Sequence, residues 1–195
     1  MIHVIGPKER KWAPKGRLID TTSRSKTWSR GLSPFNLGPV KCYDGLIARN
    51  MENAWQFAKV YPQFVNNLGE PSKKYFVWRD EGWKDPVPYR YPMGKGVVPT
   101  YSWWKVNGVF RALGYVEARK QIYIPLYTEA VKKTPAFRVL RRLYQRHKEL
   151  WLWDFDGYNH RDSRLQFNYR DVIDCETKKM GHAFVLAMLL EGFLV

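Results

Sequence analysis

The order of hydrophobic and polar positions predicts a chain of short strands and helices. Residues 40–43 predict a strand, Asp44-Gly45 predicts a turn, and residues 46–48 lead into a helix over 49–61. The stretch YVEARKQIYIPLY (115–127) predicts β structure, and residues 126–150 predict a helix that is interrupted or restarted near Pro135. LWLWDF (150–155) predicts a buried strand that ends in acids. Residues 181–195 are apolar on all sides, which predicts a central buried helix.

Two stretches lack a clear period. Residues 1–30 are rich in basic side chains, Pro, Ser and Thr, and predict an irregular basic arm. Residues 70–108 are rich in Gly, Pro, Trp and Tyr, and predict an irregular loop that forms a binding surface. The remainder, 31–195, is expected to fold as a single α+β domain, because a chain of 195 residues with 45% hydrophobic positions suits one core.

The net charge of the chain indicates a polyanionic partner. The chain has 33 Lys plus Arg against 18 Asp plus Glu, a formal net charge of +15. Such a field attracts nucleic acid, and an excess of aromatic side chains suits stacking on bases. The alternative interpretation is a basic protein whose many aromatic side chains simply form its core. We expect DNA as the partner. Its backbone would be held by Lys11 and Arg17 of the arm and by a basic face over residues 138–148. That face consists of Arg138, Arg141, Arg142, Arg146 and Lys148.

Other classes of protein are not indicated. Cys42 and Cys175 are far apart and have no His pair at metal-ligand spacing, so we expect neither a disulfide framework nor a zinc site, and no cofactor. The first residues lack the apolar core of a signal peptide, and no apolar run reaches the roughly 20 residues of a membrane span. A cytoplasmic location is the resulting expectation.

One polar stripe carries candidate chemistry. At about 100° per residue, Glu52, Gln56 and Lys59 share one side of a helix, whereas Trp55 lies with other apolar residues on the opposite side. An ordinary amphipathic helix with a solvent-facing Glu–Lys pair would give the same pattern.

The order of three short motifs gives a more specific interpretation. LSPF (32–35), YDG (43–45) and ENAWQFAK (52–59) follow one another here. In this order they resemble the NADAR (YbiA-like) superfamily, in which a helix bears Glu, then Gln four residues later, then Lys seven residues later. The resemblance implies an N-glycosidase that cleaves the bond between a nitrogen and the anomeric carbon of ribose, in riboflavin intermediates or ADP-ribosylated guanine. It implies that Glu52 is the catalytic carboxylate.

The downstream acids leave alternatives open. The family places a late acid before a Trp-Gly pair, whereas this chain has LWLWDFDGYNH without that pair. Asp154 or Asp156 is expected to assist Glu52, because a second carboxylate can activate water while the first stabilises the sugar cation. The same Asp-x-Asp-Gly resembles the nucleophile motif of haloacid-dehalogenase-type phosphatases, or the metal-binding acids of glycosyltransferases, both of which use a metal ion.

Further side chains are expected to contact the substrate. Trp55, Gln56 and Lys59 would surround it, and Trp103 and Trp104 could stack on a flipped base, although at least one of the two could equally belong to the core. Lys95 between two glycines fits a flexible loop, and Lys59 or Lys95 would be the amine of a lyase step. His160 is a weaker candidate, and His182 fits a structural residue.

These features combine into one hypothesis. The chain is predicted to be a DNA glycosylase of NADAR-like architecture that flips a modified base and hydrolyses its N-glycosidic bond, with phage–host conflict (antiviral defence) as the setting. Each phosphate that a basic side chain neutralises adds binding affinity, so the high positive charge favours polymeric DNA over a small metabolite as the substrate. An ADP-ribosyl-guanine or small-nucleotide N-glycosidase, and a non-catalytic nucleic-acid-binding protein, are the alternatives.

Overall fold

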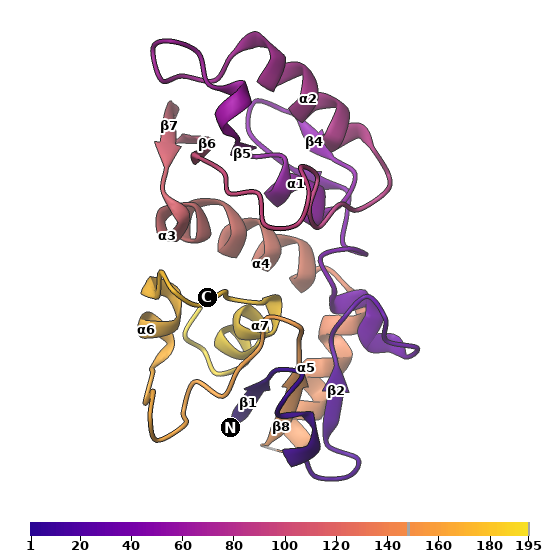
Figure 1. The fold of residues 1–195 in the computed structure, drawn as a ribbon. Helices are drawn as coiled ribbons and strands as arrows, with labels where there is room; N and C mark the ends of the chain where they lie inside the picture. Colours follow the sequence, from indigo (N-terminus) through magenta and orange to yellow (C-terminus); the bar gives the residue numbers. More distant parts are fainter. Residues whose placement is uncertain (148, 195) are drawn as a thin grey trace. The chain divides into compact units, whose positions relative to one another are not determined.

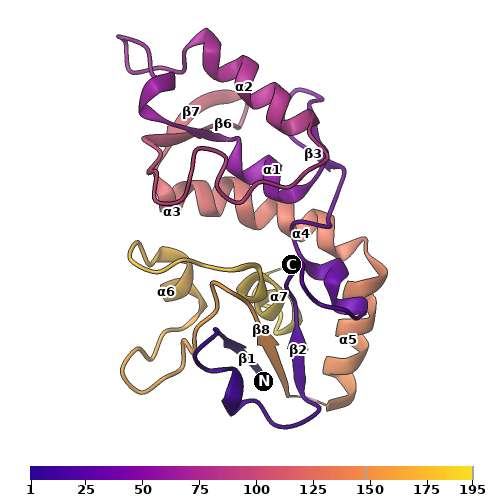
Figure 2. The same cartoon turned by 45° about the vertical axis from the view of Figure 1, so that its right-hand side comes forward.

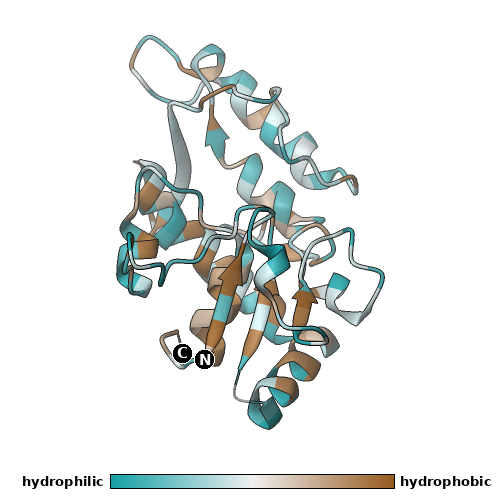
Figure 3. Cartoon of the chain, turned by 60° about the horizontal axis from the view of Figure 1, so that its bottom comes forward, coloured by the Kyte–Doolittle hydropathy of each residue, from teal (hydrophilic) through white to brown (hydrophobic). Residues whose placement is uncertain are grey.

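Three strands from distant parts of the chain lie side by side in the computed structural model, which describes residues 1–147 and 149–194 (Figure 1). β1 (Ile2–Ile5), β8 (Leu150–Trp153) and β2 (Leu18–Asp20) pair in parallel in the order β1-β8-β2. Hydrophobic residues dominate these strands (Figure 3), and most residues of β1 and β8 are buried, whereas β2 is half-buried. The predicted strand at LWLWDF is confirmed.

The contacts divide the chain into two units. The terminal unit consists of Met1–Asn36 and Tyr127–Val195, and the central unit is Leu37–Leu126. We expected a basic arm over 1–30 followed by one domain over 31–195. Strands β1 and β2 lie inside that arm, so the prediction of irregular structure was wrong there, because both strands pair with β8, which lies 133 to 148 residues further along the chain.

The terminal unit surrounds its sheet with helices. In chain order it also contains η1 (Arg10–Trp12), η2 (Trp28–Leu32), most of α4 (Ile124–Lys132), α5 (Pro135–His147), α6 (Tyr169–Asp174) and α7 (His182–Leu190). Helix α7 packs beside β1 and is buried from His182 to Met188 on every side, which confirms the predicted central helix. The predicted interruption near Pro135 is confirmed as the break between α4 and α5.

The central unit is built on short elements. In chain order it contains β3 (Val40–Lys41), β4 (Ile47–Ala48), α1 (Met51–Gln56), β5 (Lys59–Val60), η3 (Pro62–Phe64), α2 (Lys73–Lys84), β6 (Tyr101–Val106), β7 (Val109–Leu113), α3 (Tyr115–Ala118) and the π-helical turn η4 (Arg119–Tyr123). The predicted hairpin is confirmed, with Asp44 and Gly45 at positive φ in its turn. Helix α3 lies beside the β6–β7 hairpin (Figure 2).

Three predictions of secondary structure in the central unit were wrong. Residues 115–127 are helical rather than β, with Ala118, Ile122 and Leu126 buried at every fourth position. Residues 73–84 form a helix within the predicted irregular loop. The helix predicted over 49–61 ends at Gln56, because Phe57 packs against Gly82 and the next residues join β5; a Cβ on Gly82 would lie 2.0 Å from the Phe57 ring.

The mixture of elements settles the class. About 39% of the residues are helical and 16% are in strands, so the α+β prediction is confirmed. Within the described residues, no helix has the length and apolar character that crossing a membrane requires.

Candidate functional site

Helix α1 is held rigidly by two asparagines. The Asn50 side chain accepts a hydrogen bond from the backbone N–H of Asn53 and caps the helix. Asn53 is fully buried, and its amide nitrogen lies within 3.0 Å of the carbonyl oxygens of Gly82, Asp85 and Val87. This anchor was not predicted from the sequence, although an Asn directly before the first helical residue is a capping signal.

Two side chains of this helix and one of β5 form a hydrogen-bonded relay. Gln56 Nε2 donates to Glu52 Oε1 at 2.9 Å, and Lys59 Nζ donates to Gln56 Oε1 at 2.6 Å. These two bonds fix the amide, because its carbonyl must face the ammonium and its amino group must face the carboxylate. The Lys59 ammonium also lies 4.8 Å from the centre of the Trp55 ring.

Burial separates this relay from an ordinary helix surface. Glu52 is 5% exposed and Gln56 is 8% exposed, so the alternative of a solvent-facing Glu–Lys pair was wrong. Lys59 is half-buried and belongs to β5, where it lies opposite Ser102. A buried carboxylate is costly to desolvate and is rarely found without a structural or chemical role. The structure therefore brings Glu52, Gln56 and Lys59 together, but through β5 rather than one helix face, and it places Trp55 beside Lys59 instead of on the opposite side.

The two predicted stacking tryptophans have different surroundings. Trp104 is 6% exposed and packs edge-on against Tyr43, which makes it a core residue. Trp103 points to the other face of β6, where its ring is parallel to that of Phe110 at 5.8 Å. The expectation that at least one of the pair belongs to the core is confirmed. Lys95 is exposed between Gly94 and Gly96, which both have positive φ.

In the terminal unit, Asp154 forms a buried pair with His182. Asp154 Oδ2 lies 3.0 Å from His182 Nδ1 and accepts the N–H of Ala183 at 3.1 Å, while Oδ1 accepts the N–H of Asp156 at 3.2 Å. His182 Nε2 lies 2.8 Å from the carbonyl of Thr21. Asp154 thus links the end of the middle strand to the start of α7, and His182 has the structural role predicted for it.

These contacts decide the charge of Asp154. Burial alone would raise its pKa, but the neighbouring His182 and the N–H groups of Ala183 and Asp156 lower it to about 2. Gly181 is needed here, because a Cβ on it would lie 2.2 Å from Asp154 Oδ2. Both carboxylate oxygens serve protein groups, an arrangement that favours a structural carboxylate over the phosphatase or glycosyltransferase interpretation. Asp156 is half-buried.

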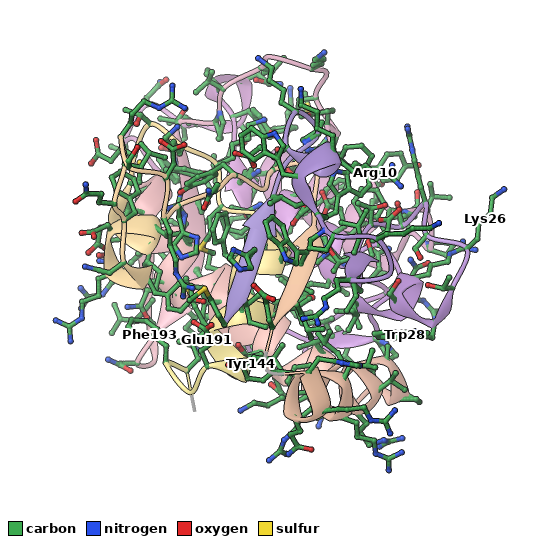
Figure 4. All side chains as sticks on the ribbon, turned by 90° about the horizontal axis from the view of Figure 1, so that it is seen from below. Arg10, Lys26, Trp28, Tyr144, Glu191 and Phe193 are labelled. Carbon is green, nitrogen blue, oxygen red and sulfur yellow. The ribbon has the colours of Figure 1, made fainter. Side chains whose placement is uncertain are left out.

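The predicted basic face lies on helix α5. Its four arginines, Arg138, Arg141, Arg142 and Arg146, are exposed and span about 140° of the helix surface. The helix contains no Asp or Glu, and none of the four forms an ion pair with any residue of 1–147 or 149–194. Nitrogen-tipped side chains project outward from α5 in Figure 4. Lys148, which we grouped with this face, lies outside the described residues.

A second basic segment lies beside helix α5. Helical turn η2 packs against α5, where a Cβ on Gly31 would lie 3.0 Å from the Cβ of Ala136. The side chain of Lys26, just before η2, extends away from the ribbon (Figure 4), and Trp28 is 39% exposed. Lys11, on η1, is exposed without an ion pair in the described chain, whereas Arg17 is paired with Glu149 at 3.2 Å.

His160 is buried in the terminal unit, with 2% of its surface exposed. Burial, together with the nearby Arg161, lowers the pKa of His160 from 6.5 to about 4, so the side chain is neutral at neutral pH.

We expect the free energy of unfolding to fall as the pH is lowered from 6.5 to about 4. The unfolded chain takes up a proton on His160 near pH 6.5, whereas the folded chain resists it until about pH 4. Urea unfolding across this range, for the wild type and for His160→Phe, measures the effect. The variant should show a flatter pH dependence, and equal slopes in the two proteins would contradict this assignment.

The chain matches no protein-family model, and no curated protein or solved structure is significantly similar to it. The NADAR resemblance thus stays a prediction that rests on the motifs at 32–61.

Proposed function

We propose that the protein is an N-glycosidase that acts on DNA and releases a modified base. The observation that carries the proposal is the relay in which the buried Glu52 and Gln56, on a helix anchored by Asn53, are joined to the half-buried Lys59 of β5. A carboxylate fixed in this way suits a reaction that builds positive charge on a sugar, because a preorganised negative group stabilises that charge best where water is scarce.

In the proposed reaction, the bond between the sugar C1′ and the base nitrogen breaks, and the base leaves with the bonding electrons. Glu52 stabilises the cationic sugar and accepts a proton from the attacking water, whose oxygen bonds to C1′; that proton passes to the departing base, which restores the carboxylate. Gln56 and Lys59 are positioning residues that hold the carboxylate in one orientation. The proposal gives Asp154 no chemical step, and a role for Asp156 as second acid stays a prediction.

The basic surface supports polymeric DNA as the substrate. From Arg138 to Arg146 the helix rises about 12 Å, and duplex DNA carries one charge per about 1.7 Å of axis, so this face is long enough to meet several phosphates. Cations that lack acidic partners gain most from an anionic ligand. This argument favours DNA over a free nucleotide.

Incubation of the purified protein with unmodified DNA and with DNA that carries phage-type base modifications tests the proposal. Mass spectrometry detects released bases, and alkali cleavage detects abasic sites. Base release from one modified DNA supports a glycosylase. Binding without any product would instead support the alternative of a non-catalytic binding protein, and release only from free nucleotides would support a small-molecule enzyme.

Removal of the α5 cations should weaken DNA binding in a salt-dependent way. Each phosphate contact contributes about 0.9 to the slope of log affinity against log salt, so replacing the four α5 arginines by Gln should reduce the slope by up to about 4. Fluorescence anisotropy at several salt concentrations measures it. Lys105, Lys133 and Arg164 are already paired with carboxylates, so their replacement should change the slope less per charge; an equal change would count against α5 as the contact surface.

A further inference from the structure

A cavity of about 360 Å³ lies in the terminal unit, and Glu52, Asp154 and Asp156 are not among its lining residues. It is lined by His160, Arg161, Gln166, Phe167, Asn168 and Tyr169. The loop that forms it is closed by backbone hydrogen bonds from Phe167 to His160 and from Gln166 to Asp162, both at 2.8 Å. The wall is therefore shaped by the fold before any ligand arrives.

His160 is the unusual member of this wall. Its Nδ1 is buried and has no hydrogen-bond partner, and no described residue bonds either ring nitrogen. The ring stacks on Tyr169, with centroids 5.3 Å apart and planes 24° from parallel. Buried polar groups are almost always hydrogen-bonded, so a buried histidine with neither nitrogen bonded is unusual. Nδ1 is occluded, whereas Nε2 keeps some accessible surface and is the nitrogen that a ligand in the cavity could reach.

The charges around the cavity are already balanced. Arg161 donates to Glu191 Oε2 at 2.8 Å, and Tyr169 Oη donates to the same oxygen at 2.8 Å. Burial would raise the pKa of Glu191 (labelled in Figure 4), but these bonds and the N–H of Ile2 lower it, so it remains the counter-charge of Arg161. Arg161 is the charged side chain of the described wall and is already paired with Glu191, which the N-terminal ammonium of Met1 also approaches to 3.9 Å.

The other groups of the cavity wall are uncharged amide side chains and aromatic rings. The Asn168 side-chain oxygen caps α6, and no described residue accepts from its amino group. Gln166 supplies a second amide at the rim, where its Nε2 donates to the carbonyl of Ser163. Phe167 and Tyr169 provide ring surfaces. Amides that read a polar edge and aromatic rings that stack on a flat face are what a pocket for a nucleobase requires.

We propose that this cavity binds an uncharged planar heterocycle with hydrogen-bonding edges, the chemistry of a nucleobase. His160 and Asn168 would bond its edge while the aromatic rings contact its face. The proposal extends the function proposed above, but it rests on the cavity alone and does not require Glu52 to be catalytic.

Titration of the four uncharged nucleosides, followed by ligand-observed NMR, tests it directly. We expect saturable binding of at least one nucleoside to the wild type, and a loss of at least tenfold in His160→Phe, which keeps a flat ring but removes both nitrogens. Asn168→Ser should also weaken binding while it preserves the helix cap. The matched control is His147→Phe, at an exposed position on α5, which should bind as the wild type does.

Measurements of folding distinguish a loss of binding from a loss of structure. His160→Phe should unfold at the same or a higher temperature than the wild type, because it removes an unsatisfied buried polar group. Weaker binding therefore cannot be attributed to loss of structure. Nucleoside binding that is absent, or that is equal in His160→Phe and the wild type, would overturn the proposal.

A second comparison identifies the source of the base. A single-stranded oligonucleotide and its abasic counterpart carry the same phosphates, so a preference for the base-containing strand that His160→Phe abolishes assigns the cavity to nucleic acid. Nucleoside binding without that preference assigns it to free nucleosides. Running both assays in Glu52→Gln, which should bind normally, separates failure of this proposal from failure of the glycosidase proposal.

Discussion

Replacement of Glu52 by Gln is expected to lower base release by about 10²–10⁴-fold, the usual contribution of a positioned acid or base. The substitution keeps the size of the side chain, and the new amide oxygen can still accept from Gln56, so folding should be preserved. Only the negative charge is lost. Single-turnover release of base from the responsive DNA measures the rate, and anisotropy measures the affinity, which should not change.

The exposed Glu70 offers a matched control, since Glu70→Gln removes the same charge from the same unit and should release base at the wild-type rate. Gln56→Leu should lower the rate less than Glu52→Gln does, because it disconnects Lys59 without removing the carboxylate. A Glu52→Gln protein that is unfolded would show that the relay is structural. One that is folded and fully active would exclude Glu52 as the catalytic carboxylate.

The second large effect concerns stability. His182→Ala is expected to lower the free energy of unfolding by about 3–5 kcal/mol, because it leaves the carboxylate of Asp154 buried without its counter-charge. Asp154 is 4% exposed, so water cannot readily replace the imidazole. Urea unfolding at pH 7 measures the loss, with the exposed His147→Ala as the control. A loss below about 1 kcal/mol would contradict a stabilising pair.

The same pair predicts an acid limit of stability. The folded pKa of Asp154, about 2, lies below its unfolded value of 3.8, so the pair stabilises the fold above pH 3.8 and this stabilisation is lost as the pH falls towards 2. His182→Ala should remove this part of the pH dependence. The double change Asp154→Leu with His182→Leu should cost less than His182→Ala alone, since no unpaired charge remains.

Local sequence signals were sufficient to predict an element when the conformation of that element depends on its own residues. The turn at Asp44-Gly45, the break near Pro135 and the uniformly apolar α7 were predicted correctly. In each case the signal is backbone chemistry or a continuous apolar run, which neighbours in space do not overrule. Helical spacing correctly paired Glu52 with Gln56, whereas Lys59 joins them from β5, which the spacing did not predict.

Other elements depended on partners far away in the chain. Residues 115–127 are rich in β-forming residues, yet they are helical because burial of every fourth residue outweighs intrinsic propensity. In α2, the buried Arg79 and Gly82 interrupt the apolar pattern, so the period was hidden. Strands β1 and β2 were hidden in the same way, because what makes them strands is β8.

The sequence by itself thus determined the α+β class, the basic charge, and the identity and order of the residues in the relay. Only the tertiary structure decided that Glu52 is buried, that Asp154 is occupied by His182, and that His160 lines a cavity without a partner. Residue spacing specifies which side chains share one face of an element. Whether that face meets water, a counter-charge or a cavity depends on segments that are distant in the chain, and so it is decided only when the chain folds.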